Sequence, residues 1–125
     1  MSENLSPLDV ANRYLNAYNA FDLDTLFSFL DENVYLIHHN RGFVTEGKAA
    51  TSDLYRGTPD LIPDRQLGER SIAAVDGNRV VVQHVLTGTP KVDLPFGPAG
   101  EAFKIDIVTV FTVENGKVVK YEDYG

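Results

Sequence analysis

The sequence predicts an α+β fold: a cone-shaped barrel of a strongly curved antiparallel sheet, with three N-terminal helices closing a concave pocket. Apolar residues recur at helical spacing in the first part of the chain, whereas runs rich in β-branched and aromatic residues follow Arg65. Asp76-Gly77-Asn78 and Asn115-Gly116 indicate two hairpins, because these residues tolerate positive φ. Helices followed by antiparallel strands are the order typical of this class.

Two helices are predicted near the N-terminus. Ser6-Pro7 is typical of an N-cap followed by proline in the first turn, where the missing N–H costs little. An apolar and aromatic stripe at three- and four-residue spacing follows as far as Phe21. Asp22 is expected to cap a second helix that runs through Leu30.

A third, shorter helix is predicted over residues 47–55, because Gly57 is suited to end it and Pro59 and Pro63 follow in a loop. The segment 88–100 is rich in glycine and proline, and we interpret its Leu94-Pro95-Phe96 as a hydrophobic lid. Strands are expected at residues 34–39, 66–75, 79–87, 102–113 and 117–124, with the strand from Arg79 near the centre of the sheet.

Composition limits the class of protein. The 125 residues are expected to form one domain, 1–125. The net charge of −7 and the scattered basic residues argue against a nucleic-acid partner. No signal-like or membrane-spanning segment and no cysteine are present, which favours a cytoplasmic protein that does not bind membranes. No metal is expected, because His-x-His, Glu-x-x-His and cysteine are all absent.

Asp123 is the main candidate for chemistry. Alternation along the last strand places it on the face of Val119 and Tyr121, which is apolar. A buried carboxylate needs partners or a raised pKa, and either is compatible with proton transfer. A solvated aspartate near the C-terminus is the alternative interpretation.

His84 lies between Val82 and Leu86 on an apolar face. One interpretation is a core histidine whose hydrogen bonds are satisfied. The other is an acid/base dyad in which Asp123 hydrogen-bonds His84, or a water that both residues bind, and fixes the tautomer of the imidazole.

His38 and His39 are adjacent on a strand and must face opposite ways, so they cannot chelate a metal together. Counting from Tyr35 and Ile37 places His39 in the pocket. There it is either a general base near neutral pH or a histidine bound to a backbone carbonyl at the strand end.

Tyr14 and Tyr18 lie one turn apart on the helix stripe that faces the sheet. Each is either a core residue or a pocket residue whose hydroxyl could reach a ligand, and Tyr14 is the favoured pocket residue. Val108 and Val110 lie in line on the outer face, beside Asp106, and indicate a homodimer contact.

Four segments carry a resemblance to a known family. The first segment, residues 13–24, is an expected aromatic helix that ends in Phe21-Asp22-Leu23-Asp24. The second, residues 38–40, is His-His-Asn, and the third, residues 86–100, begins with Leu-Thr-Gly-Thr. The fourth, residues 116–123, begins with Gly-Lys-Val-Val and ends with Asp123. In this order they resemble motifs of the SnoaL-like polyketide cyclases, where glycine is usual at the position of Phe21. The wider nuclear-transport-factor-2-like superfamily also holds ketosteroid isomerase and limonene epoxide hydrolase, and the resemblance covers nearly the whole chain.

The resemblance implies roles for individual residues and no cofactor. Asp123 matches the cyclase aspartate that acts as acid or base, and Thr109 falls where cyclases place its partner histidine. Asn40 matches the water-binding asparagine of the epoxide hydrolase, and His84 falls where that enzyme has a pocket arginine. Tyr14 falls at the oxyanion-hole tyrosine of the isomerase.

Two activities of the superfamily are disfavoured by this comparison. Leu86 stands where the epoxide hydrolase has its second aspartate, and no carboxylate stands near Ile37 or His38, where the isomerase has its base.

Two functional hypotheses follow. The first is a homodimer that binds a small apolar, carbonyl-bearing molecule as a cofactor-independent acid/base enzyme of cyclase, isomerase or hydrolase type. The second is a non-catalytic ligand-binding or interaction module, which the threonine at position 109 favours. In the first, Asp123 and His84 are catalytic, and the substrate-binding residues are Tyr14, Tyr18, His39, Asn40 and Thr109.

Overall fold

The computed structural model describes residues 5–94 and 97–125. Three helices, a short 3-10 segment and six strands follow one another in the order α1 (Pro7–Asn19), α2 (Leu23–Ser28), β1 (Leu30–His38), η1 (His39–Arg41), β2 (Phe43–Glu46), α3 (Lys48–Leu61), β3 (Gln66–Asp76), β4 (Arg79–Gly88), β5 (Phe103–Glu114) and β6 (Lys117–Tyr124).

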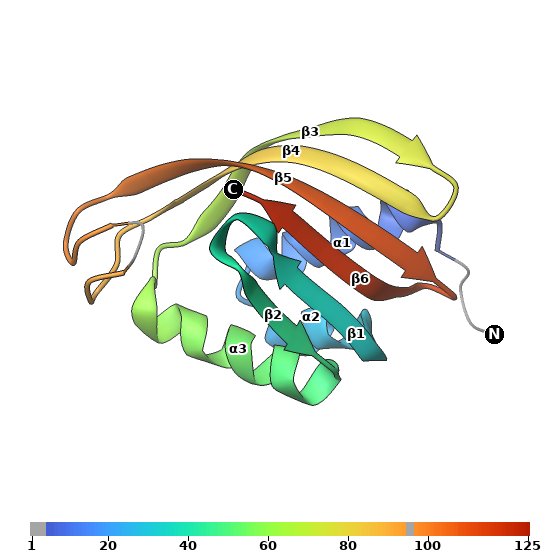
Figure 1. Cartoon of the computed structure of the whole chain (residues 1–125), viewed down its shortest axis with the longest axis horizontal. Helices are drawn as coiled ribbons and strands as arrows, with labels where there is room; N and C mark the ends of the chain where they lie inside the picture. Colours follow the sequence, from blue (N-terminus) through green and yellow to red (C-terminus); the bar gives the residue numbers. More distant parts are fainter. Residues whose placement is uncertain (1–4, 95–96) are drawn as a thin grey trace.

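The six strands form one curved sheet in the order β2-β1-β6-β5-β4-β3 (Figure 1). The α+β fold is confirmed, but the sheet is mixed, because β1 pairs with β6 in parallel. It is also open, with β2 and β3 as its edges. The prediction that the strand from Arg79 lies near the centre was wrong, since β6 and β5 hold that place.

The helices pack against the concave side of the sheet. In Figure 1, α1 lies behind β5 and β6, and α3 lies below β1 and β2. Tyr14 of α1 is fully buried and contacts Phe111 and Tyr121 of the sheet, with ring centroids 5.4 and 5.8 Å away. This aromatic contact joins α1 to the two central strands.

The predicted helix starts are confirmed. The Ser6 hydroxyl accepts a hydrogen bond from the Asp9 N–H at 3.1 Å, and the Asp22 carboxylate accepts one from the Thr25 N–H at 3.3 Å. Each bond satisfies an N–H group that has no partner within its own helix.

The predicted turns are confirmed as well. Gly77 has a φ of 59°, and Asn115 and Gly116 have φ values of 54° and 73°. The positive values match those required in tight hairpin turns.

Two local predictions were wrong, and one strand was missed. Helix α3 continues through Gly57 and Pro59 to Leu61. Tyr55 contacts Tyr14 of α1, and Thr58 and Leu61 lie in the wall of the cavity, so packing on both sides of Gly57 keeps this segment helical. Strand β2 was not predicted; it pairs with β1 and extends the sheet edge. The register of β6 shifts after Val118, so Val118 rather than Val119 is buried, although Tyr121 and Asp123 still face inward.

Candidate functional site

A cavity of about 700 Å³ lies on the concave side of the sheet, and every strand of the sheet and helices α1 and α3 contribute to its wall. Leu94 lies in this wall, as the lid hypothesis requires, whereas Pro95 and Phe96 are outside the described residues. Most of the wall is apolar. The polar side chains that line it are Tyr18, His38, Asn40, Tyr55, Thr58, Tyr121 and Asp123.

Asp123 is buried, as predicted, and its carboxylate is within hydrogen-bond distance of the His38 imidazole. Their Oδ2 and Nδ1 atoms are 2.7 Å apart, and the exposed fractions of the two side chains are 4% and 17%. The two residues are direct partners in the parallel register of β1 and β6. At this distance the Nδ1–H donates to the carboxylate, which sets the tautomer of the imidazole.

The prediction that His39 faces the pocket was wrong. Tyr35 and Ile37 lie on the outer face of β1, while Val34 and Leu36 are buried, so alternation sends His38 inward and His39 outward.

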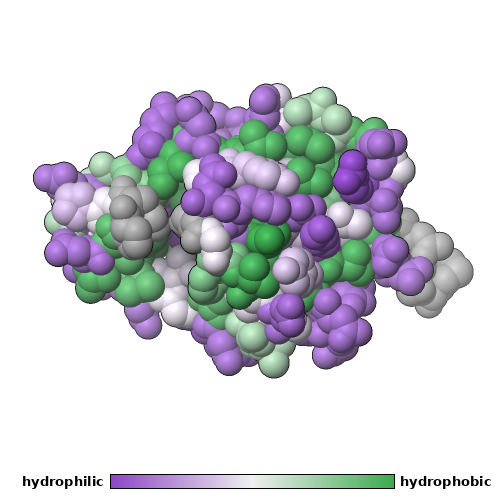
Figure 2. Space-filling model, viewed as in Figure 1, coloured by the Kyte–Doolittle hydropathy of each residue, from purple (hydrophilic) through white to green (hydrophobic). Residues whose placement is uncertain are grey.

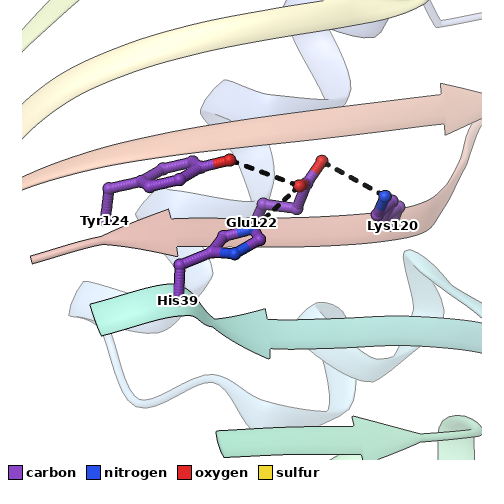
Figure 3. A network of polar contacts seen from close by, with 4 residues as sticks. All are labelled: His39, Lys120, Glu122 and Tyr124. Carbon is purple, nitrogen blue, oxygen red and sulfur yellow. Dashed lines mark hydrogen bonds and ion pairs between the residues drawn. The ribbon is translucent and has the colours of Figure 1, made fainter. Parts of the chain in front are cut away.

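On the outer face, His39 belongs to a polar network with three residues of β6 (Figure 3). Its Nε2 is 2.9 Å from Oε2 of Glu122, and its ring stacks on Tyr124 at 4.3 Å. Lys120 lies 3.6 Å from the other carboxylate oxygen of Glu122. This network is separated from the cavity by the sheet itself.

His84 does not hydrogen-bond Asp123. Its Nε2 lies 2.7 Å from the Thr109 hydroxyl, and its Nδ1 has no hydrogen-bond partner among the described residues. Burial, with a contribution from the nearby Arg70, lowers the pKa of His84 from 6.5 to about 4, although the charge of Asp123 opposes the shift. His84 is therefore a neutral core histidine near neutral pH. The prediction of a direct hydrogen bond to Asp123 was wrong, whereas a water shared by the two residues stays a prediction.

A cluster of tyrosines lies beside the His38–Asp123 pair. The hydroxyls of Tyr14 and Tyr55 are 2.5 Å apart, and Tyr18 packs edge-on against Tyr55 at 6.0 Å. Burial raises the pKa values of Tyr14, Tyr55 and Tyr121 well above 10, and Asp123 contributes to the rise at Tyr55 and Tyr121. These phenols stay neutral, so their hydroxyls act only through hydrogen bonds, in which each can donate or accept.

The predicted site residues fall into three groups. Asp123, Tyr18 and Asn40 line the cavity. Buried behind its wall are Tyr14, His84 and Thr109, and His39 lies on the opposite face.

Sequence reasoning missed His38, Tyr55 and Tyr121 as cavity residues. For His38 the sequence carries no deciding signal, because apolar residues lie on both faces of β1: Val34 and Leu36 on one face, and Tyr35 and Ile37 on the other.

Among residues 5–94 and 97–125, no three histidine or acidic side chains gather where they could hold a metal ion. Within the same residues, none of the helices has the length and apolar character needed to cross a membrane. The expectations of no metal and no membrane partner remain predictions.

The family model of the SnoaL-like domain matches residues 11–121. The chain belongs to this SnoaL-like family. The resemblance seen in the four sequence segments is thereby confirmed. A search of curated proteins finds no match.

Solved structures share the fold of this SnoaL-like chain. A proposed polyketide cyclase from Pseudomonas putida superposes with a TM-score of 0.84 at 20% identity, covering 97% of this chain and 92% of that one. A cystatin-fold protein from Novosphingobium aromaticivorans gives 0.77 at 28% identity, over 95% and 97% of the two chains. A nuclear-transport-factor-2-like protein from Burkholderia pseudomallei gives 0.77 at 21%, over 98% and 90%.

Proposed function

We propose that this SnoaL-like protein is a cofactor-independent acid/base enzyme that acts on a small apolar molecule bearing a carbonyl group. One observation carries the proposal: a buried carboxylate, Asp123, is held by His38 in the wall of a largely apolar cavity. A carboxylate in such a place is suited to proton transfer, because little water competes for the substrate proton.

The reaction would begin with transfer of a proton from a carbon next to the carbonyl to Asp123. The electron pair of the broken C–H bond moves toward the carbonyl, so the substrate becomes an enolate and Asp123 a neutral acid. His38 orients the Asp123 carboxylate through its Nδ1–H. Neutral tyrosine hydroxyls such as that of Tyr55 donate hydrogen bonds to the negatively charged oxygen of the enolate.

The proton held on Asp123 then returns to the substrate. Return to a different carbon gives an isomerase. In a cyclase, the enolate carbon attacks a second carbonyl carbon of the same molecule, and the new alkoxide takes the proton. Neither outcome needs an oxidant or a reductant. The structural neighbours include a proposed polyketide cyclase and a proposed isomerase, and they support this class of reaction.

Exchange of substrate hydrogen with solvent tests the first step. Apolar ketones and β-diketones that raise the melting temperature would be incubated with the protein in heavy water and followed by NMR. We expect the wild type to accelerate exchange next to the carbonyl for at least one of them, and Asp123→Asn to abolish the acceleration. Binding with no accelerated exchange for any compound would favour the ligand-binding module.

We further propose a cytoplasmic homodimer that uses the outer face of the sheet. Val108 and Val110 of β5 are part-exposed there, as are Tyr35 and Ile37 of β1. Figure 2 shows hydrophobic patches between polar ones on the face of the molecule that turns away from α1. Light scattering tests the assembly: Val108→Asp should convert a dimer into a monomer, and a monomeric wild type at micromolar concentration would contradict it.

A further inference from the structure

Arg65, in the link between α3 and β3, is fully buried although arginine is always charged. Its Nη1 donates to the backbone carbonyl of Tyr18 at 2.8 Å, while Nε and Nη2 have no partner among the described residues. No carboxylate within the described part of the chain lies at ion-pair distance from it. Burial of a cation without a paired anion lowers the stability of the fold, and this cost points to a role for Arg65 other than stability.

Two aromatic rings take the place of an anion. The guanidinium carbon lies 3.5 Å from the ring centroid of Tyr18 and 4.3 Å from that of Phe21. Phe21 reaches this position with a φ of 56°, a left-handed conformation that a bulky residue rarely adopts. Phe21 follows the end of α1, where the Asp22 N–H donates to the Ala17 carbonyl, so its left-handed φ closes the helix while its ring lies over Arg65.

Tyr18 connects Arg65 to the cavity, since the same side chain lines the cavity wall. The positive charge also reaches the tyrosine cluster: Arg65 lowers the pKa of Tyr14, against the larger effect of burial, whereas Asp123 raises those of Tyr55 and Tyr121. The tyrosines therefore lie between a carboxylate on one side and a guanidinium on the other.

We propose that Arg65 is a positioning residue that makes the Tyr18 end of the cavity electropositive, so that the cavity selects apolar ligands carrying an oxygen anion, such as an enolate or a phenolate. A cation against its ring makes the Tyr18 hydroxyl a stronger hydrogen-bond donor. This inference rests on the proposed function, because it names the ligand class of the same cavity. The charge of Arg65 also orients the ligand, with the anionic oxygen of the ligand toward Tyr18 and its reacting carbon toward Asp123.

The probe for this proposal is para-nitrophenol, whose ionised form absorbs visible light, with para-nitrotoluene as the neutral control. Wild-type protein should bind the phenolate in preference to the phenol, which lowers the pKa of the bound probe. Arg65→Met should weaken phenolate binding about tenfold, the size expected for one unit charge at roughly 10 Å and an effective dielectric constant of about 20. Binding of para-nitrotoluene should not change.

Three further variants separate this role from a structural one. Arg56→Met removes an exposed arginine that lies 5.0 Å from the Phe27 ring, and it should leave phenolate binding unchanged. Arg65→Lys keeps the charge and should restore part of the lost affinity. Tyr18→Phe keeps the ring on which Arg65 stacks and removes the hydroxyl, so it should fold even where an Arg65 variant does not, and still lose phenolate preference.

Arg65→Met removes the hydrogen bond to the Tyr18 carbonyl and the contacts with two rings, so its melting temperature should fall. Unchanged binding of para-nitrotoluene by the folded variant, together with weaker phenolate binding, is the readout that a purely structural role would not produce. Wild-type protein that does not bind the probe, or that binds phenol and phenolate equally, would overturn the proposal. So would a Tyr18→Phe variant with unaltered preference. The probe has no hydrogen next to a carbonyl, so these results do not depend on proton abstraction by Asp123.

Discussion

Two histidine–carboxylate pairs join β6 to the end of β1 and the first residue of η1, and they lie on opposite faces of the sheet. His38 and Asp123 face the cavity, with exposed side-chain fractions of 17% and 4%. His39 and Glu122 face outward, with fractions of 32% and 13%. The N–O distances, 2.7 and 2.9 Å, are nearly equal, so the difference between the pairs comes from their surroundings.

The outer carboxylate is surrounded by groups that favour its charge. Burial alone would raise the pKa of Glu122, but the hydrogen bond from His39 and the charge of Lys120 outweigh it and the pKa falls. The inner carboxylate faces an apolar cavity and neutral tyrosines instead. One pair is therefore suited to stabilise the sheet surface, and the other is suited to exchange protons with a ligand.

The largest expected difference between the pairs is in activity. Asp123→Asn should reduce the rate of hydrogen exchange by about 10²- to 10⁴-fold, the usual contribution of a general acid or base. Glu122→Gln, the matched change one residue earlier, should alter the rate less than about twofold, because its side chain does not reach the cavity. Equal losses in the two variants would show that the comparison of faces is wrong. NMR exchange rates measured side by side provide the test.

A second effect concerns His84, an inner-face histidine that has no carboxylate partner. Its pKa of about 4 in the folded state is below the ordinary 6.5, so the unfolded chain binds more protons between these values. The stability due to neutral His84 is complete above about pH 6.5 and is lost as the pH falls toward 4, by about 2 kcal/mol after discounting for solvent screening. Urea unfolding from pH 7 to pH 4 would measure it.

His84→Leu is the control for this pH effect. The variant removes the titrating group, so its stability should fall less steeply over the same pH range than that of the wild type. Parallel curves for the two proteins would mean that His84 is not a buried neutral imidazole.

The two adjacent histidines should differ by a smaller factor. His38→Gln removes the orienting imidazole but leaves Asp123 in place, so kcat/KM should fall by about tenfold, within the range found when a supporting partner is lost. His39→Gln should leave kcat/KM unchanged, because its partner Glu122 is on the outer face. The reverse order of effects would place His39, as first predicted, at the site.

The smallest effect should be the stability that the outer pair contributes. Glu122→Gln should lower the free energy of unfolding by less than about 1 kcal/mol, because the pair is partly exposed. Added salt should reduce the difference, since salt screens exposed charges. A larger loss that salt does not change would indicate that Glu122 has a buried role, and denaturant titrations at low and high salt would decide.

Several features were correctly predicted because they depend on neighbouring residues alone. Ser6 and Asp22 cap helices by binding N–H groups three residues away, and Asn115-Gly116 adopts the positive φ values of its turn. The inward direction of Asp123 was predicted because it shares the alternation of Val119 and Tyr121. A bulge separates Val119 from the other two residues, but Tyr121 and Asp123 lie on the same side of the bulge and both face inward. The SnoaL-like family was likewise identified from local motifs.

Other features could not be predicted from local pattern. Alternation requires that His38 and His39 face opposite ways, but β1 has apolar residues on both faces, so the pattern does not tell which face is the core. Likewise, Gly57 and Pro59 are typical helix ends, and only the packing of α3 on the cavity keeps them helical.

The sequence by itself determined the helix starts and the tight turns, since these arise from backbone sterics and hydrogen bonds within a few residues. The order of helical and strand-like patterns determined the class of fold. The tertiary structure alone decided that β1 runs parallel to β6, and this pairing brings His38 to Asp123. It also decided that Arg65 is buried against Tyr18, far from it in the chain. Contacts of this kind depend on which surfaces bury together, and that free energy belongs to the whole packed core rather than to any short segment.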